Sequence, residues 1–393
     1  MRTRPSFSLC MIVRDEAGNL PRSLGPVAGF FDEAVIVDTG STDGTPELAR
    51  SYGARVLRIE WPGDFAAARN VSLGEASGDW IMWLDADNQV SPEGVERLRA
   101  LLDPAGRAVL WCTEVVVPAG ERLIQKRVFP RRPEVYFAGR VHEQLVHPAD
   151  YRSVLAPVEI LHWGYADKAA ARAKGERNLG LLFEMARENP DDPYLCYQVG
   201  RTLLNLRRFD EARTWLEKSA RSEAGPLLNP GLHAHVHILL ARALERLDRP
   251  AEAEKVLAGL TAARADYGPG HYALGRLKYA RREYAAAAES FQTFLRLGAG
   301  DPVAGFNPRR MYFTAAMLLG RCFEEIGKPV EADRAYTLAA RSDPVHPEPP
   351  LAQARLALNL GRREEAAGYL SRCLKVAPGH RRAAALLEEA GLG

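Results

Sequence analysis

The feature that most constrains the fold of this sequence is an internal repeat in its second half. In five stretches a glycine or alanine stands twelve positions before an alanine, in the pairs Gly200/Ala212, Ala241/Ala253, Gly275/Ala287, Gly320/Ala332 and Ala354/Ala366. Successive alanines of these pairs are separated by 41, 34, 45 and 34 positions. A base period of 34, with small residues where two helices cross closely, is typical of stacked helical hairpins, and the excess lengths then fit loop insertions.

The repeat predicts an all-α solenoid of about five helical hairpins over residues 191–393. Its period and its small residues, plain in Leu319–Pro344, are the pattern of tetratricopeptide repeats. Stacked hairpins of this kind form a groove that binds peptides or serves as a dimerisation surface. We therefore expect this half of the chain to be a scaffold.

The first 165 residues follow a different pattern, in which short apolar runs alternate with helical stretches. The apolar runs of strand length are Phe7–Val13, Ala34–Asp38, Arg55–Ile59 and Trp80–Leu84. The helices predicted between them span 19–31, 46–52 (with Thr45 as N-cap and Pro46 at the first helical position) and 65–76. Continuous rather than alternating hydrophobicity indicates strands that are buried on both faces, as in a parallel sheet. The order predicts a doubly wound, Rossmann-like α/β domain over residues 1–165.

Four more strands and one long helix are expected before the repeats. The strands are predicted at 108–117, 123–129, 135–137 and 158–162, and the helix at 167–188. Residues 166–190 are predicted to be a helical linker between the two domains.

Composition limits the class of protein. A chain of 393 residues predicts two or three domains, and 47% apolar with 26% charged residues is ordinary globular composition. Lys and Arg total 52 against 50 acids, so the net charge of +2 gives no reason to expect a nucleic-acid partner, and no nucleic-acid motif is present. Arginine outnumbers lysine 44 to 8, which indicates genome bias, so local arginine clusters are weak evidence.

The cysteines and the N-terminus bear on location. Five scattered cysteines without a CxxC form neither a disulfide framework nor a zinc site, and they suit a reducing cytosol. The N-terminus is charged and lacks the apolar core and cleavage site of a signal peptide. No apolar run approaches the ~18 residues of a membrane span. We expect a cytoplasmic protein without transmembrane segments.

Polar residues follow three of the predicted strands at the edge where doubly wound sheets bind ligands. The first strand ends at Arg14–Glu16, the second at Asp38–Gly44 and the fourth at Asp85-Ala86-Asp87. Carboxylates two apart on a strand point to opposite faces, so Asp85 and Asp87 reach one ligand only if the chain turns there. One would then bond a ribose and the other a divalent ion on a diphosphate. An Asp pair also serves as a plain turn, but its place after the fourth strand favours the ligand role.

Other residues at this edge have two interpretations. Asp38 is expected to accept a hydrogen bond from a base or ribose, whereas Asp43 is expected to form the turn. Arg69 either contacts the ligand or lies on an exposed helix face. No GxGxxG or GxxxxGK[ST] motif is present. The chain therefore lacks the phosphate-binding loops that are typical of dinucleotide-dependent dehydrogenases and of P-loop NTPases.

A second polar group lies further along, at 126–127, 139–144 and 162–165. Glu143 is a candidate general base, and Arg127 is a candidate to offset charge on a departing diphosphate. His142 or His162 would complete a metal site with Asp87, since imidazole binds ions such as Mn²⁺. The alternatives are a buried histidine with its hydrogen bonds satisfied, a surface ion pair and a solvated arginine.

Five ordered segments resemble a known family. They are Ser8–Glu16, Ile36–Thr45, Phe65–Leu73, Gly78–Asp87 and Gly139–Gln144. The chain resembles family-2 glycosyltransferases of the GT-A fold, and more narrowly the subgroup with C-terminal tetratricopeptide repeats that includes the sublancin-type peptide S-glycosyltransferases. The resemblance extends over nearly the whole chain.

The resemblance implies inverting transfer from a nucleotide-diphosphate sugar, usually a UDP-sugar, with Mg²⁺ or Mn²⁺. By position, the resemblance implies that Asp38 contacts the nucleobase, Asp85 contacts the ribose and Asp87 binds the metal. It also implies that Val13, Arg14 and Glu16 line the nucleotide pocket. Glu143 is the candidate for the carboxylate base, although many relatives place that base further along, after a Glu-Asp pair that is absent here. Many relatives also carry an acid where this chain has Asn88, which lowers the negative charge beside the metal.

Three functions fit these observations. The first is a transferase whose repeats present a peptide or protein acceptor, and Asp38, Asp85, Asp87 and Glu143 favour it. The second is an adaptor with repeats that bind a partner and a catalytically silent nucleotide-sugar domain. The third is a transferase for a lipid-linked or polysaccharide acceptor, with repeats that form a homodimer; the lack of membrane spans argues against a lipid acceptor.

Overall fold

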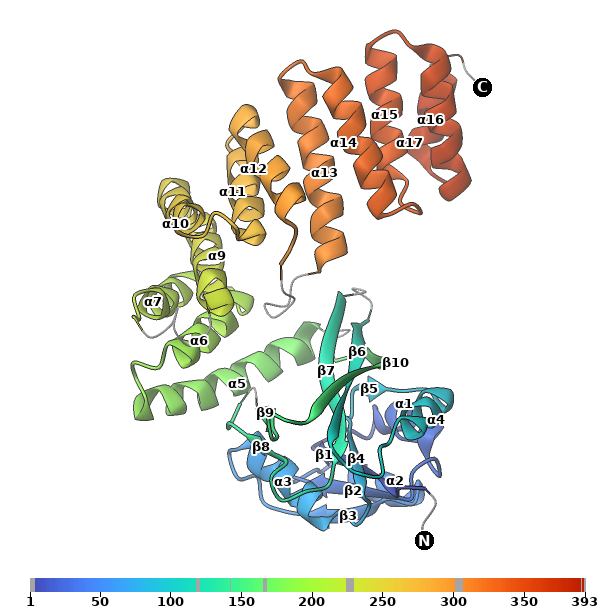
Figure 1. Ribbon diagram of the computed structural model, residues 1–393, viewed down its shortest axis with the longest axis vertical. Helices are drawn as coiled ribbons and strands as arrows, with labels where there is room; N and C mark the ends of the chain where they lie inside the picture. Colours follow the sequence, from blue (N-terminus) through green and yellow to red (C-terminus); the bar gives the residue numbers. More distant parts are fainter. Residues whose placement is uncertain are drawn as a thin grey trace. The chain divides into compact units, whose positions relative to one another are not determined.

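The computed structural model describes residues 4–117, 121–141, 143–164, 168–223, 230–300, 307–389 and 391. The chain divides into two compact units, 1–184 and 185–393. The first holds a curled sheet with helices and the second is a succession of helices (Figure 1). The division falls within helix α5 (Lys168–Glu188), inside the stretch predicted to be a linker.

The sheet of the first unit has eight strands in the order β3-β2-β1-β4-β7-β6-β10-β5. Its strands are β1 (Phe7–Val13), β2 (Glu33–Asp38), β3 (Arg55–Arg58), β4 (Trp80–Trp83), β5 (Asn88–Gln89), β6 (Ala108–Val116), β7 (Glu121–Pro130) and β10 (Arg152–His162), and a separate ribbon pairs β8 (Tyr136–Ala138) with β9 (Gln144–Val146). Strands β3, β2, β1 and β4 run parallel, as expected of a doubly wound sheet. Antiparallel β7 then joins β4 to β6, so the whole sheet is mixed.

The predicted strands are confirmed, but one predicted helix is wrong. Instead of one helix over 19–31, the chain forms α1 (Leu20–Ser23) and the 3₁₀ turn η1 (Gly25–Val27). Pro26 follows Gly25 and has no N–H to continue the helical ladder, which ends the helix early. The other helices of this unit are α2 (Thr45–Ser51), α3 (Phe65–Glu75) and α4 (Pro92–Ala100), and α4 was not expected from the sequence. Gly44, at φ +83°, takes the N-cap position of α2 that was predicted for Thr45.

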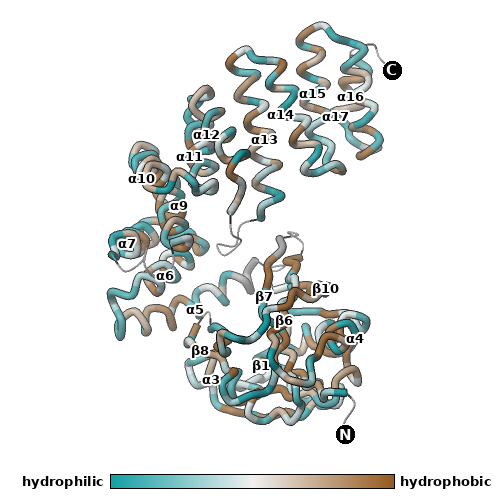
Figure 2. The backbone as a smooth tube through the Cα atoms, in the orientation of Figure 1, coloured by the Kyte–Doolittle hydropathy of each residue, from teal (hydrophilic) through white to brown (hydrophobic). Residues whose placement is uncertain are grey.

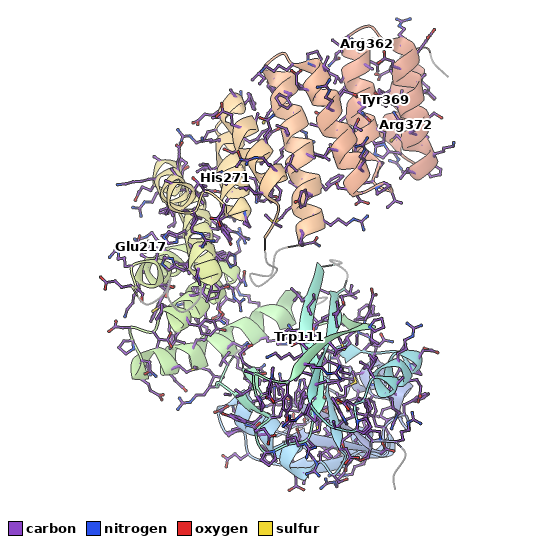
Figure 3. The ribbon with its side chains drawn as sticks, viewed as in Figure 1. Trp111, Glu217, His271, Arg362, Tyr369 and Arg372 are labelled. Atoms are coloured by element: carbon purple, nitrogen blue, oxygen red, sulfur yellow. The ribbon has the colours of Figure 1, made fainter. Side chains whose placement is uncertain are left out.

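Hydropathy differs between the two units as the sequence pattern predicts. Brown, apolar stretches occur along β6, whereas β7 and the repeat helices mix apolar and polar stretches (Figure 2). Trp111 lies on β6 with the Lys126 ammonium 5.2 Å from its ring centroid (Figure 3).

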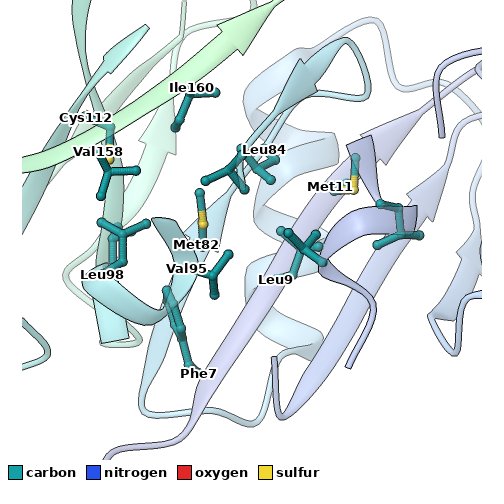
Figure 4. Packing of buried hydrophobic residues seen from close by; sticks show 14 of the residues in the cluster. Phe7, Leu9, Met11, Met82, Leu84, Val95, Leu98, Cys112, Val158 and Ile160 are labelled. Carbon is teal, nitrogen blue, oxygen red and sulfur yellow. The ribbon is translucent and has the colours of Figure 1, made fainter. Parts of the chain in front are cut away.

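The main core of the first unit lies between the sheet and α4. Residues of β1 and β4 pack there against Val95 and Leu98 of α4 and against Val158 and Ile160 of β10 (Figure 4). All four of these side chains are buried. The core therefore fixes the two strands whose ends carry the candidate site, β4 and β10.

The described residues of the second unit form five helical hairpins and a last helix. The hairpins are α6 (Pro193–Asn205) with α7 (Phe209–Ala220), α9 (Pro230–Arg246) with α10 (Pro250–Ala263), α11 (Gly268–Ala280) with α12 (Tyr284–Leu297), α13 (Pro308–Glu325) with α14 (Pro329–Ser342), and α15 (Glu348–Asn359) with α16 (Arg363–Val376), followed by α17 (Arg381–Glu389). The longer repeats carry their extra residues between α7 and α9 and between α12 and α13.

The small residues of the repeat lie where the two helices of each hairpin cross. The five alanines on the second helices are fully buried. A Cβ added to Gly200 would lie 2.6 Å from Leu216 Cγ, and one on Gly275 would lie 2.9 Å from the Phe291 ring. Leu216 and Phe291 each lie four positions after the repeat alanine of their hairpin. The twelve-residue spacing therefore marks the place where the two helices of a hairpin are in contact.

Candidate active site

The pairing of β5 with β10 builds the candidate site. After β4 the chain turns, and the Asn88 N–H donates to the Asp85 carbonyl at 2.9 Å. Strand β5 then pairs antiparallel with the end of β10, with Asn88 opposite His162. The turn after β4, on which the Asp85-Ala86-Asp87 prediction depended, is thus present, and it brings Asp87 next to His162.

The side chain of Asp87 is mostly buried and lies between His162 and Lys174. His162 Nδ1 is 3.4 Å from Asp87 Oδ1, and the Lys174 Nζ of α5 is 3.4 Å from Oδ2. Burial alone would raise the pKa of Asp87, but His162 and Lys174 outweigh it and hold that pKa below its ordinary value. Oδ1 is buried without a hydrogen-bond partner among the described residues. A buried acceptor of this kind costs free energy unless a ligand satisfies it.

Gly164 and Asn88 shape the space around these groups. A Cβ on Gly164 would overlap Asp87 Oδ2 and would lie 3.1 Å from His162 Cε1, so only glycine leaves the carboxylate in place. Asn88 is fully buried, with Nδ2 2.9 Å from His162 Nδ1 and Oδ1 accepting the Asp85 N–H at 3.3 Å. Asn88 therefore fixes both the turn and the imidazole.

His162 is buried beside two carboxylates. Its Nδ1 is 3.8 Å from Glu114 Oε1 in addition to its contact with Asp87. Burial would lower the pKa of His162, but Asp87 and Glu114 raise it above the ordinary value. The ring therefore carries a proton more readily than a free histidine unless another cation takes its place beside Asp87.

Asp85 lies between two arginines. Arg69 Nη2 is 3.2 Å from Oδ1, and Arg127 Nη1 is 3.1 Å from Oδ2. Burial would raise the pKa of Asp85, but both guanidinium groups outweigh burial and hold it far below the ordinary value. Arg127 is buried at an irregularity where β7 shifts register against β6, and it also pairs with Glu114. Bulges often redirect a side chain in this way.

Arg69 also connects Asp85 to Glu143. The Arg69 guanidinium pairs with the Glu143 carboxylate and lies 3.9 Å from the Trp83 ring centroid. Only 11% of the Glu143 side chain is exposed. Neighbouring Asn70 holds the β8 backbone in place through two 2.8 Å hydrogen bonds with Phe137. Arg69 therefore faces the site, and Asn70 has a structural role.

The loops after β1 and β2 form the other side of the same sheet edge. Val13 is buried opposite Asp38 in the β1–β2 register, and Arg14 is exposed. Asp38 is fully buried, with its carboxylate accepting from the Ser41 N–H at 3.1 Å and lying 3.5 Å from Arg58 Nε. As the nucleotide contact, Asp38 stays a prediction. Asp43 accepts from Ala17 and Thr45, as expected of a turn residue.

Glu16 links this loop to the carboxylates of the site. Burial raises the pKa of Glu16, and the charges of Asp87 and Lys174 act on it too. The site holds charges of both signs, since Arg177 lies near Glu16 and Arg14, while Arg69 and Arg127 pair with Asp85 and Lys174 pairs with Asp87.

The metal ligands Asp87, His162 and His142 stay a prediction. No cluster of three or more His, Cys, Asp or Glu side chains with metal-site geometry occurs in the described ranges. Asp87 and His162 nevertheless lie together, with one orphaned carboxylate oxygen, and they fit a Mg²⁺ or Mn²⁺ that keeps water and phosphate ligands. His142, the alternative ligand, lies outside the described residues.

Sequence reasoning missed three residues of the site. Glu114 lies on a strand with no motif, and Lys174 lies in the stretch predicted to be a linker; both act through tertiary contacts with no local signal. Gly164 stood inside the noted segment 162–165, where a glycine two positions after a candidate ligand was the available signal.

Comparisons with known proteins define the class. Residues 8–155 match the family model "Glycosyl transferase family 2", and residues 197–269 and 272–347 match a "Tetratricopeptide repeat" model. The chain therefore combines a family 2 glycosyltransferase domain with tetratricopeptide repeats, as its motifs suggested.

Individual proteins are similar to about half of this chain. A TPR repeat-containing protein of Synechococcus elongatus is 35% identical over 54% of this chain and 56% of its own length. The SPbeta prophage-derived glycosyltransferase SunS of Bacillus subtilis is 28% identical over 55% of this chain and 53% of its own length. The chain thus spans about half the length of these curated relatives. The solved TPR protein YrrB is similar at a TM-score of 0.41 and 17% identity, over 53% of this chain and 97% of that one.

Proposed function

We propose that this chain is a metal-dependent inverting glycosyltransferase that moves a sugar from a nucleotide-diphosphate sugar, a UDP-sugar, to an acceptor. The observation that carries the proposal is the turn after β4, which holds a buried Asp87 oxygen 3.4 Å from His162 Nδ1 with no hydrogen bond among the described residues. The match of residues 8–155 to family 2 supports the reaction class.

The residues of the site divide into two groups. Asp87 and His162 would hold Mg²⁺ or Mn²⁺, which supplies charge neutralisation for the diphosphate leaving group when bound. Val13, Arg14, Glu16 and Asp38 would line the nucleotide side. Arg69 and Arg127 pair with the two carboxylate oxygens of Asp85 and keep it ionised, and Asp85 would contact the ribose.

Glu143 is the proposed base. The acceptor nucleophile gives its proton to the Glu143 carboxylate and attacks the anomeric carbon from the face opposite the diphosphate, while the bond from that carbon to the diphosphate oxygen breaks. Arg69 pairs with Glu143 and holds the carboxylate in one orientation. Arg127 offsets negative charge as the diphosphate departs.

The repeats are proposed to present a peptide or protein acceptor. A homodimer through the solenoid, with a lipid-linked or polysaccharide acceptor, is the alternative use of the same unit. None of the helices in the described ranges is long and apolar enough to cross a membrane. All five cysteines are free and buried, which supports a cytoplasmic location.

The test is donor hydrolysis and binding. The purified chain is incubated with a panel of nucleotide-diphosphate sugars and Mn²⁺, and released nucleotide and calorimetric affinity are measured. We expect slow, metal-dependent hydrolysis of one UDP-sugar, lost in Asp87→Asn and kept in the surface control Asp150→Asn. If no donor binds with or without metal, the silent-domain adaptor replaces this proposal.

The Glu143→Gln variant distinguishes two roles of Glu143, that of catalytic base and that of nucleotide ligand. Because the amide cannot take a proton, we expect the transfer rate to fall at least ~100-fold with donor affinity nearly unchanged. A matching loss of donor affinity would instead make Glu143 a nucleotide ligand.

A further inference from the structure

An arginine follows the small residue on the first helix of every repeat. These five residues, which we call the arginine ladder, are Arg201, Arg242, Arg276, Arg321 and Arg355. Arginine makes up 44 of 393 residues, about one in nine, so composition alone does not place one at the same position in all five repeats. The occurrence of an arginine at the same position in each repeat, rather than the total number of arginines, indicates a functional surface.

The ladder lies on one layer of helices. Its members belong to α6, α9, α11, α13 and α15, the first helices of the five hairpins. Helix α9 contacts both α6 and α11, and α11 contacts α13, so the first helices are neighbours along the solenoid. Except for half-buried Arg201, the ladder arginines are exposed.

Two cavities open on this layer, and ladder arginines line both. One, of about 550 Å³, lies between α11 and α13 and combines Arg276 and Arg310 with the rings of Tyr272 and Tyr279. The other lies along α13, α15 and α17, and Arg321, Arg355 and Arg382 line it together with Glu348 and Glu389. Guanidinium groups beside aromatic rings recognise carboxylates while the rings pack on the chain that carries them.

Few acids on the layer offset these charges. Glu245 lies near Arg242 and Arg276, and burial raises the pKa of its carboxyl group against their influence. Glu324 lies 3.7 Å from Arg355, and it also accepts a hydrogen bond from Tyr336. Together the five first helices carry nine Lys or Arg residues against four Glu residues, which leaves the layer positive.

We propose that the arginine ladder binds an extended acidic segment of a partner protein. Neighbouring packed helices lie about 8–10 Å apart, and an extended chain advances about 3.3 Å per residue. Each step of the ladder therefore matches about three residues of the segment, so its carboxylates recur at about every third position. This inference concerns the repeat unit alone and holds whether or not the first unit transfers a sugar.

The test is direct binding to the full chain. The probe is a fluorescein-labelled 18-residue peptide with Glu at every third position and Ser or Ala elsewhere, followed by fluorescence anisotropy at low salt. We expect saturable binding that the Gln version of the peptide lacks, and that weakens as salt is added. Arg276→Ala with Arg321→Ala should weaken binding at least fivefold.

A matched control removes the same charge from the second helices. Arg296 of α12 and Arg341 of α14 are exposed, and their double alanine variant should bind the Glu peptide as the parent does. Far-ultraviolet circular dichroism confirms that both double variants fold. The proposal is overturned if the Gln peptide binds equally well, if the control variant loses as much affinity as the ladder variant, if the Glu peptide does not bind, or if a single-stranded oligonucleotide of equal charge binds more tightly than the Glu peptide.

Discussion

Asp87 and Gly164 lie so close together that a single methyl group distinguishes an open site from a blocked one. A Cβ at Gly164 would overlap Asp87 Oδ2 and lie 3.0 Å from its Cγ. In Gly164→Ala the carboxylate must turn away from His162, because the glycine backbone is fixed by the end of β10 and the Trp163 N–H donates to the Asp87 carbonyl at 2.9 Å. We expect at least tenfold weaker Mn²⁺ binding by calorimetry, with the melting temperature lowered by only a few degrees.

The control for this variant is Gly180→Ala. Gly180 lies on α5 with open space where its Cβ would stand, so the change should leave metal binding unaltered and slightly favour the helix. Unchanged Mn²⁺ affinity in Gly164→Ala would show that Asp87 is not a ligand.

Asp85 should make the first unit sensitive to acid. Its folded pKa is depressed, so the stabilisation from Arg69 and Arg127 is fully present above about pH 4 and is lost as the pH falls below that value. Asp85→Asn, which leaves Arg127 with Glu114 alone, should lower the free energy of unfolding by about 2 kcal/mol at pH 7. The difference from the parent should shrink between pH 5 and pH 3.

Tryptophan fluorescence in urea measures this difference. Five of the six tryptophans lie in the first unit, so the signal reports on that unit. A difference that stays constant down to pH 3 would mean that the Asp85 ion pairs do not contribute.

The sequence predicted the carboxylates of the site better than their partners. Asp85 and Asp87 follow a continuous apolar strand, and that local pattern is enough to place them at the ligand edge of the sheet. Glu114 and Lys174 carry no such signal, since they reach the site through the β6–β10 pairing and through α5. Asn88 was noticed only as a missing charge, whereas its amide orients His162.

At the scale of elements, Gly320 on α13 makes a tighter contact than Gly200 or Gly275 does at its own hairpin crossing, and its neighbour is Tyr336 on α14. A Cβ on Gly320 would overlap Tyr336 Cε1 and lie 2.7 Å from Cδ1 and Cζ. Tyr336 is fully buried, so its ring has no space to move aside. Gly320→Ala should therefore destabilise the second unit by about 1–3 kcal/mol, despite the better helix propensity of alanine, as measured by circular dichroism in urea.

Gly368→Ala is the matched control on α16. Gly368 has open space around its missing Cβ, so propensity alone acts, and the variant should be about 0.5–1 kcal/mol more stable. If both variants were stabilised, the small residues would not mark the crossing of the two helices.

Elements with a strong period were predictable, and short ones were not. The hairpins followed from a spacing repeated five times, because close helix crossings admit only small residues. The two-residue strand β5 has no pattern of its own, yet its pairing with β10 forms the site. Within 19–31 the apolar spacing suited a helix, but Gly25 and Pro26 broke it, since backbone chemistry overrides periodicity.

At the scale of the whole molecule, the boundary of the first unit lies within helix α5. Lys174 contacts Asp87, and the Arg177 guanidinium lies 5.8 Å from the Phe65 ring centroid, so α5 completes the first unit rather than merely connecting it to the repeats. A fragment of residues 1–190 should fold and bind the donor nucleotide with Mn²⁺ within about threefold of the full chain. A fragment of residues 1–165, the domain predicted from the sequence, lacks these contacts, and we expect it to bind at least tenfold more weakly and to melt at a lower temperature.

If the short fragment does not fold, the Lys174→Met variant of the full chain distinguishes the loss of the Lys174 charge from the loss of helix α5, since it removes the charge and keeps the helix. Equal affinity of the short fragment and the full chain would show that α5 is a connector only.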